Sequence, residues 1–177
     1  MKHSLILLLL IIALLGCGGC KGTEESKNTD NIDHQLKVTA GKESIKSVVL
    51  VKSGDTKFYD EMNAFKYAFE NNTSTDIKYI KKGEKVTLNF GNIAPDDVSV
   101  KDILLNSDGG NLYSDKWDID IPLVNEGSNF SFYLEGNPST GLSSEMAPNK
   151  KQSRGFKVTA IWGDKEYIYA FVIKSDK

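Results

Sequence analysis

The sequence predicts an all-β domain over residues 36–177, arranged as an antiparallel β-sandwich. Apolar and polar residues alternate with a period of two along much of this region, as they do in strands that have one buried and one exposed face. Short polar turns separate these stretches, and the last two stretches fold back on each other as a hairpin. A small β-barrel is the alternative fold that the same pattern allows.

The alternating stretches are the expected strands. In each clear case, large apolar side chains occupy every second position, so one face is expected to lie in the core. The clear cases are residues 85–90, 98–101, 117–121 and 130–134. The same pattern is weaker in residues 36–40, 45–51 and 65–69.

The segment 60–69 fits two structures. Met62, Phe65 and Phe69 are at helical spacing. Phe65, Tyr67 and Phe69, however, alternate with smaller or polar residues as in a strand. We predict a strand in this segment, and a helical start is the alternative.

The clearest supersecondary signal is at the C-terminal end. Residues 156–162 and 167–173 both alternate, and Gly163-Asp164 lies between them, which is typical of a hairpin with glycine in the turn. Both strands also carry apolar residues on the opposite face, so the hairpin is expected to be central in its sheet. Other turns are expected at Pro95-Asp96-Asp97 and Ser107-Asp108-Gly109-Gly110.

The first seventeen residues have the order of an export signal. Lys2 precedes an unbroken apolar run over 5–15, and Gly16-Cys17 follows it. As a helix this run would be roughly 16 Å long, too short for a hydrocarbon core of about 30 Å. The order resembles the signal peptide and lipobox of bacterial lipoproteins, which implies that residues 1–16 are removed.

In that family, the cysteine after the cleavage point carries the lipid. Cys17 fits this role because Leu14 lies three positions before it and Gly16 directly before it. Cys20 follows a glycine but has Cys17 three positions earlier, so it fits less well. A diacylglyceryl group has two acyl chains, which is enough for stable attachment to a membrane. The expected location is the extracytoplasmic face of the cell membrane, held by this lipid anchor.

Residues 17–35 are expected to be a flexible tether between the lipid and the domain. They are polar, carry charges of both signs and have almost nothing to bury, which is typical of disordered segments. A chain of about seventeen such residues has a reach of roughly 25 Å.

Short strands at regular spacing with polar turns indicate an immunoglobulin-like sandwich, although the domain has no cysteine for the inter-sheet disulfide. The domain also resembles small immunoglobulin-like surface lipoproteins of Gram-positive bacteria. Three short motifs carry this resemblance, namely Arg154-Gly155-Phe156, Trp162-Gly163-Asp164 and the ending Tyr169-Ala170-Phe171-Val172-Ile173. It implies no particular activity.

The inventory of side chains excludes several classes of activity. The chain has two histidines, His3 and His34, and both precede the domain, as do both cysteines. Serine–histidine triads, cysteine–histidine pairs and ordinary zinc sites are therefore excluded. A net charge of −2 gives no basic field for nucleic acid. We predict that the protein is not an enzyme and has neither a cofactor nor a nucleic acid partner.

Carboxylate chemistry and a serine–lysine pair are the remaining catalytic classes. Asp118 and Asp120 lie two apart on an expected strand and alternate with Trp117, Ile119 and Ile121. This placement is typical of solvent-facing positions, so a hydrolytic carboxylate pair is not expected.

Calcium is an alternative for one turn. Asn106, Asp108 and Asp115 surround Gly109-Gly110 and supply the oxygen ligands that calcium prefers. The EF-hand spacing is not met, and a hairpin turn explains the same residues. We predict no metal site, with calcium binding at these three residues left open.

The candidate binding loop is Trp162-Gly163-Asp164, considered together with the aperiodic segment 136–154, because sandwiches often bind through loops at one end. The rings of Trp117 and Trp162 are themselves expected in the core. The expected function is a binding or adhesion module with an extracellular protein or glycan ligand. A structural or assembly subunit of a cell-envelope complex is the alternative.

Overall fold

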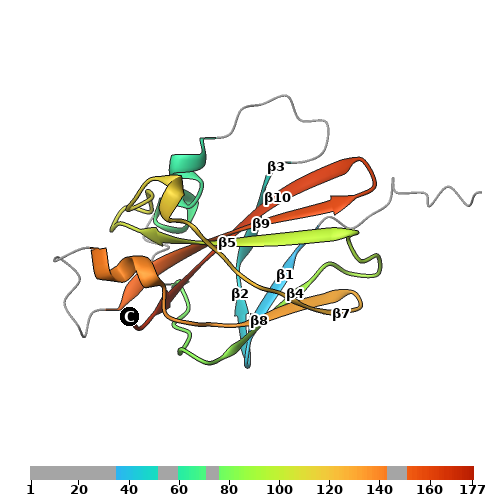
Figure 1. Ribbon diagram of the computed structural model, residues 1–177, viewed down its shortest axis with the longest axis horizontal. Coiled ribbons are helices and arrows are strands. Elements are labelled where there is room, and N and C mark those ends of the chain that lie inside the picture. The colour runs from blue at the N-terminus through green and yellow to red at the C-terminus, as the bar shows by residue number, and fades with distance from the viewer. Residues whose placement is uncertain (1–34, 52–59, 71–75, 143–150) are drawn as a thin grey trace, which may run out of the picture. The chain divides into compact units, whose positions relative to one another are not determined.

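Residues 35–51, 60–70, 76–142 and 151–177 are described by a computed structural model, and they form two antiparallel sheets of five strands each (Figure 1). Sheet A has the strand order β2-β1-β4-β8-β7, and sheet B has the order β3-β10-β9-β5-β6. The predicted antiparallel β-sandwich is therefore confirmed. Residues 1–34, which include Cys17, Cys20 and nearly all of the predicted tether, lie outside the described residues.

Most of the strands overlap the predicted stretches, but the strands over 97–105 and 152–162 are longer than predicted, and no strand was predicted at residues 124–126. The strands of sheet A are β1 (Lys37–Ala40), β2 (Glu43–Ile45), β4 (Lys85–Asn89), β7 (Val124–Glu126) and β8 (Asn129–Tyr133). Those of sheet B are β3 (Ser47–Val51), β5 (Asp97–Leu105), β6 (Ile119–Asp120), β9 (Gln152–Trp162) and β10 (Lys165–Ser175). Four short 3₁₀ helices are described, η2 (Glu61–Asn63), η3 (Lys66–Ala68), η5 (Asp115–Trp117) and η6 (Pro138–Leu142).

The strand order is that of an immunoglobulin-like sandwich. Strands β1-β4-β8-β7 take the places of A-B-E-D, and β10-β9-β5 take those of G-F-C, with β6 added beside C. The N-terminal edge departs from this plan. β1 and β2 form a hairpin, and the chain then crosses to sheet B, where β3 pairs antiparallel with β10. The single strand predicted over 45–51 is therefore two strands in different sheets.

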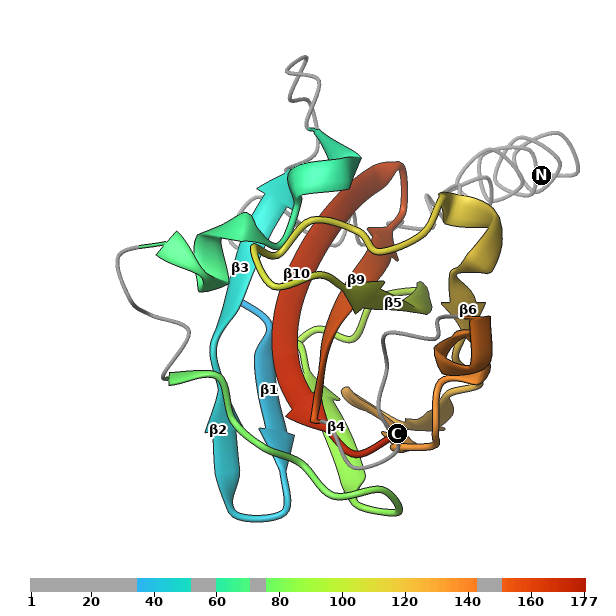
Figure 2. The same cartoon turned by 90° about the vertical axis from the view of Figure 1, so that its left-hand side faces the viewer.

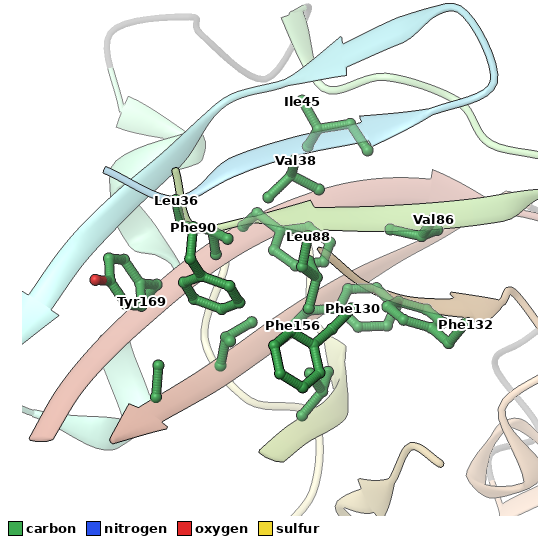
Figure 3. Packing of buried hydrophobic residues seen from close by; sticks show 14 of the residues in the cluster. Leu36, Val38, Ile45, Val86, Leu88, Phe90, Phe130, Phe132, Phe156 and Tyr169 are labelled. Atoms are coloured by element: carbon green, nitrogen blue, oxygen red, sulfur yellow. The ribbon is translucent and has the colours of Figure 1, made fainter. Parts of the chain in front are cut away.

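Between the sheets lies an aromatic core. Figure 3 shows side chains of both sheets pointing toward one another, among them Val38, Leu88 and Phe130 of sheet A and Phe156 and Tyr169 of sheet B. The ring of Phe156 stacks on that of Phe171 at a centroid distance of 4.8 Å. Burial of such rings supplies the cohesion that the missing inter-sheet disulfide would give.

The C-terminal hairpin is central, as predicted. β9 and β10 pair along their whole length from Lys165↔Trp162 to Ser175↔Gln152, and each has a further strand on its other side. Gly163 has a φ of 60°, which a glycine adopts without strain in the turn between them.

A second apolar cluster covers the outer face of sheet B, and it corrects the prediction of a strand over 65–69. This segment forms 3₁₀ turns instead, beginning where the Met62 amide donates to Asp60 Oδ1 at 3.1 Å. Phe65 is fully buried against the outward residues of β5 and β10, including Ile103 and Val172. The apolar residues of 65–69 alternate as in a strand because this segment lies flat on sheet B and turns those residues toward it.

Two connections thus cover the outer face of sheet B. Figure 2 shows the 60–70 segment and the β5–β6 connection (residues 106–118) lying on this side of the sheet. They touch each other, because the amide of Asn111 donates to the carbonyl of Met62 at 3.2 Å. The predicted strand over 117–121 is correspondingly shorter, since Trp117 ends η5 and only Ile119–Asp120 pair with β5.

At one end of the core, the inner face of sheet B carries a buried ion pair. Arg154 of β9 donates through Nε to Asp102 Oδ1 of β5 at 3.0 Å and through Nη2 to Oδ2, and both side chains are almost completely buried. Asn137 adds a donor to Asp102 Oδ2 at 2.9 Å. Arg154 Nη1 also donates to the carbonyl of Glu135 at 2.7 Å and to Ser175 Oγ at 3.3 Å. The network ties the β8–β9 connection to sheet B.

Across the described residues, no helix combines the length and apolar character that a membrane crossing needs.

Candidate binding cleft

A cleft of about 480 Å³ opens on the outer side of sheet B. It lies between η2, the β5–β6 connection and β9. Its lining consists of Glu61, Met62, Asn111, Leu112, Tyr113, Ser114, Asp115, Asp118 and Lys157. The volume is within the range of about 300–1,000 Å³ that is usual for small-molecule sites.

The β5–β6 connection reaches this position because one of its glycines allows close packing. Gly109 has a φ of 88°, and a Cβ atom built on it would lie 2.4 Å from the Phe69 ring. The backbone amides of the turn are capped locally. Asn106 Oδ1 accepts from the amides of Asp108 at 3.1 Å and Gly110 at 2.9 Å. Only glycine at 109 combines this backbone conformation with contact to the 60–70 segment.

The charges of the cleft are partly paired. Lys157 Nζ lies 3.1 Å from Glu61 Oε1, and the lysine side chain is only 17% exposed. Burial raises the pKa of the Asp118 carboxyl, while the positive charges of Lys101 and Lys157 act in the opposite direction. Asp118 is therefore a partly desolvated carboxylate that faces no ion-pair partner within 4.0 Å among the described residues.

Two polar atoms of the cleft-lining residues are buried and have no hydrogen-bond partner within the described part of the chain. They are Asn111 Oδ1 and the hydroxyl of Tyr113. Each unpaired buried group of this kind costs about 1–3 kcal/mol, and native structures contain few. The β5–β6 connection therefore carries two polar atoms that are unsatisfied among the described residues and are closed off from solvent.

The structure separates the residues of the predicted binding loop. Trp162 is 3% exposed, and its Nε1 donates to the carbonyl of Ile93 at 3.1 Å, so its ring belongs to the core and not to a binding surface. Gly163 and Asp164 form an exposed turn. The described parts of the segment 136–154, residues 136–142 and 151–154, lie at the other end of β9, roughly 33 Å away along an eleven-residue strand. Its residues 143–150 lie outside the described residues.

Two residues differ from their predicted environments. Trp117 was expected in the core, yet 40% of its surface is exposed. Asp118 was expected on a solvated strand face, but it follows η5 and lines the cleft. Asp120 is the exposed member of the pair, with Lys101 Nζ 3.8 Å from its Oδ1. The alternation predicted a strand over all of 117–121, but only Ile119–Asp120 form β6, and the sequence holds no signal that places Trp117 and Asp118 outside the strand.

The three candidate calcium ligands have other partners or positions. Asn106 Oδ1 accepts two turn amides, Asp108 Oδ1 accepts the Gly110 amide at 2.9 Å, and Asp115 begins η5. In the described ranges, no three His, Cys, Asp or Glu side chains are grouped so that they could hold a metal ion.

We expect millimolar calcium to leave the melting temperature unchanged, because binding would have to displace the amides from Asn106 and Asp108. Thermal unfolding with and without calcium, and with magnesium as the control, measures this. An upward shift with calcium alone, lost in Asp108→Asn, would contradict it.

Comparison with known proteins gives no match to this chain, whether with protein-family models, curated proteins or solved structures.

Proposed function

We propose that this protein is a lipid-anchored binding module of the cell surface, which presents the cleft on the outer face of sheet B to a ligand. The observation that carries the proposal is the cleft itself. Two connections cover the outer face of sheet B and form, together with β9, a cleft of about 480 Å³ whose lining includes Asp115, Asp118 and Lys157.

The location rests on the residues that resemble a lipobox. Leu14, Gly16 and Cys17 have the spacing of a lipid-attachment site, and the preceding apolar run is too short to span a bilayer. A binding domain on a lipid tether would stay at the membrane surface while its ligand diffuses to it.

We expect Cys17→Ser to move the protein from the membrane fraction to the soluble extracytoplasmic fraction, because the variant lacks the thiol that accepts the diacylglyceryl group. Cys20→Ser is the matched control and should remain with the membrane. Fractionation and intact-mass measurement of both variants check this. A Cys17→Ser protein that stays membrane-bound, or a wild-type mass without acyl chains, would refute the anchor.

An assembly subunit of an envelope complex is the second candidate, and a specific surface favours it. Val124 of the edge strand β7 and Tyr133 of the neighbouring strand β8 are 55% and 61% exposed on the outer side of sheet A. Exposed apolar residues at a sheet edge are typical of surfaces that pair with another protein.

The two candidates predict different partners in a pulldown from detergent-solubilised envelope. An assembly subunit would retain a protein partner in a fixed ratio, and Tyr133→Ala would release it. A binding module would retain its ligand through the cleft, and Asp118→Asn would weaken the capture. Binding that responds to neither variant would exclude both surfaces.

A further inference from the structure

We propose that the end of the domain opposite the predicted tether binds a linear polyanion. The inference concerns a surface other than the cleft, and it rests on the proposed function only for the direction in which this surface faces. It depends on three features of the described residues, which are a group of lysines, the lack of an ion-pair partner for four of them and the acidic character of the opposite end.

Segments that are far apart in the sequence bring lysines together at this end of the sandwich. They are the β1–β2 turn, the connection 78–84 that leads into β4, and the chain at the start of β9 and the end of β10 (Figure 2). The connection runs beside β10, because the Ile80 amide donates to the carbonyl of Lys174 and the Lys174 amide to that of Lys78, both at 2.8 Å. The lysines of these segments, which we call the basic end, are Lys42, Lys78, Lys81, Lys82, Lys151, Lys174 and Lys177.

Two contacts show how closely these segments approach one another. A Cβ atom built on Gly136 would lie 3.4 Å from Lys82 Nζ and 3.8 Å from the backbone of Lys177. Lys151 Nζ lies 4.2 Å from the centre of the Tyr79 ring, which belongs to the same connection as Lys82. Lysines from separate segments therefore share one surface.

This surface has an excess of positive charge, although the whole chain has a net charge of −2. The exposed lysines that form no ion pair among the described residues are Lys42, Lys81, Lys82 and Lys151. The described carboxylates at this end are fewer than the lysines, namely Glu43, Glu84, Glu135 and Asp176. Glu43 pairs with Lys78 at 3.4 Å, and Asp176 accepts from the Tyr79 hydroxyl. The positive charges still exceed the negative ones when a carboxylate at Lys177 is counted.

The other end of the sandwich has the opposite charge. Asp96 Oδ2 accepts from the Gly163 amide at 2.7 Å, so the β4–β5 connection and the β9–β10 turn lie together there. The charged residues around this contact are Asp96, Asp97, Asp164 and Glu166, with Lys37 and Lys165. β1 begins at this end, because Lys37 pairs with Asn89, the last residue of β4. The predicted tether therefore joins the domain at its acidic end.

The position of the basic end favours a polymer over a lipid surface as its partner. β9 and β10 are each eleven residues long, so the two ends are roughly 33 Å apart. The predicted tether has a shorter reach of roughly 25 Å. An anionic lipid surface would also repel the acidic end, to which the tether is joined. The basic end is thus expected to face away from the membrane, where a polymer can reach it.

The chemistry of lysine favours a series of charges over a single bound anion. Each ammonium group is a strongly hydrated point charge on a flexible stem, without the planar fork with which arginine holds one phosphate or carboxylate. Exposed lysines therefore respond to charge density. They suit a chain that carries anions in series and releases its counterions when it is bound.

Long-chain inorganic polyphosphate with a fluorescent label is a suitable probe, and fluorescence anisotropy would measure its binding to the full-length protein in a neutral detergent. If four lysines each neutralise one charge, raising the salt from about 50 mM to about 200 mM should weaken binding roughly fiftyfold. Unlabelled triphosphate should compete only weakly, because it cannot span the patch. Affinity that does not depend on salt, or triphosphate that competes as well as the polymer, would overturn the proposal.

We expect Lys81→Gln/Lys82→Gln to weaken polyphosphate binding about tenfold or more at low salt. Lys37→Gln/Lys116→Gln is the matched control, because it removes two exposed lysines that lie outside the basic end. The control should leave the affinity within about twofold of the wild type. Thermal unfolding would establish that both double variants are folded. Equal losses in the two variants would show that only net charge matters, and would contradict a site at the basic end.

Vesicles distinguish the polymer from a lipid surface. The Cys17→Ser protein, which lacks the proposed anchor, would be mixed with vesicles of phosphatidylglycerol and phosphatidylcholine and, separately, with polyphosphate. We expect the polymer to bind more tightly for the same concentration of negative charge. Tighter binding to the vesicles, lost in Lys81→Gln/Lys82→Gln, would make the partner a membrane and the polyanion assignment wrong.

Failure of this inference can be distinguished from failure of the proposed function. Lys81→Gln/Lys82→Gln leaves the lining of the cleft unchanged, and Asp118→Asn leaves the basic end unchanged. If polyphosphate does not bind but the envelope pulldown retains a ligand that is lost in Asp118→Asn, only the polyanion inference fails. If polyphosphate binds through Lys81 and Lys82 and the pulldown captures nothing through the cleft, the inference stands and the proposed cleft function fails.

Discussion

Replacing Arg154 by methionine is expected to lower the free energy of unfolding by about 3–5 kcal/mol, the usual cost of removing one partner of a buried ion pair. The variant leaves Asp102 buried at 1% exposure, with Asn137 as its remaining side-chain donor. It also frees the carbonyl of Glu135, which accepts from Arg154 Nη1 at 2.7 Å. Urea unfolding followed by circular dichroism would measure the change.

The double variant Arg154→Met/Asp102→Leu separates charge from packing. Because it removes both buried charges, we expect it to recover most of the loss, and it can even exceed the wild type in stability. Lys85→Met is the control, since it breaks an ion pair to Glu126 of 2.8 Å that is exposed, and it should change stability little. If Arg154→Met costs no more than the control, the ion pair does not hold this end of the domain together.

Gly155→Ala is expected to destabilise the domain by about 1–3 kcal/mol through overpacking. A Cβ atom at this position would lie 2.7 Å from three atoms of the Phe65 ring, which is completely buried on the outer face of sheet B. The ring cannot move away without leaving the cluster under the 60–70 segment. Thermal and urea unfolding would show the loss.

A compensating variant tests this mechanism. In the Gly155→Ala background, Phe65→Leu removes part of the clashing ring and should restore some stability, although alone it is destabilising. Gly141→Ala is the matched control, because a Cβ atom there would have no heavy atom within 4 Å. Additive effects of Gly155→Ala and Phe65→Leu would argue against a direct clash.

The sequence was sufficient to predict the sandwich and its central hairpin. In these strands, apolar residues at every second position indicate which face is buried. The turn residues between the strands indicate where the chain reverses direction. The same rule failed over 45–51, because Ile45 lies in the main core and Val49 packs against it, although their strands lie in different sheets. Alternation shows burial and does not show which sheet a strand joins.

The cleft could not be predicted from sequence for a related reason. Phe65, Tyr67 and Phe69 pack on the outside of sheet B, and only the folded structure shows that a second apolar surface exists there. Likewise, Trp117 is in phase with Ile119 and Ile121 in an alternating stretch but is 40% exposed, because the β5–β6 connection passes over the sheet before β6 begins. In both segments, packing between residues far apart in the sequence determines which side chains are buried. The local pattern of apolar and polar residues carries no information about that packing.

The hairpin at the N-terminal edge has a mechanical consequence. β1 pairs antiparallel with β4, and Ser47 Oγ donates to the carbonyl of Leu36 just before β1 begins. If Leu36 is pulled along the axis of β1 while the body of the domain is held, the force is perpendicular to the hydrogen bonds between β1 and β4 and loads them together, in shear. A sandwich loaded in this direction resists forced unfolding better than one whose first strand is peeled off bond by bond.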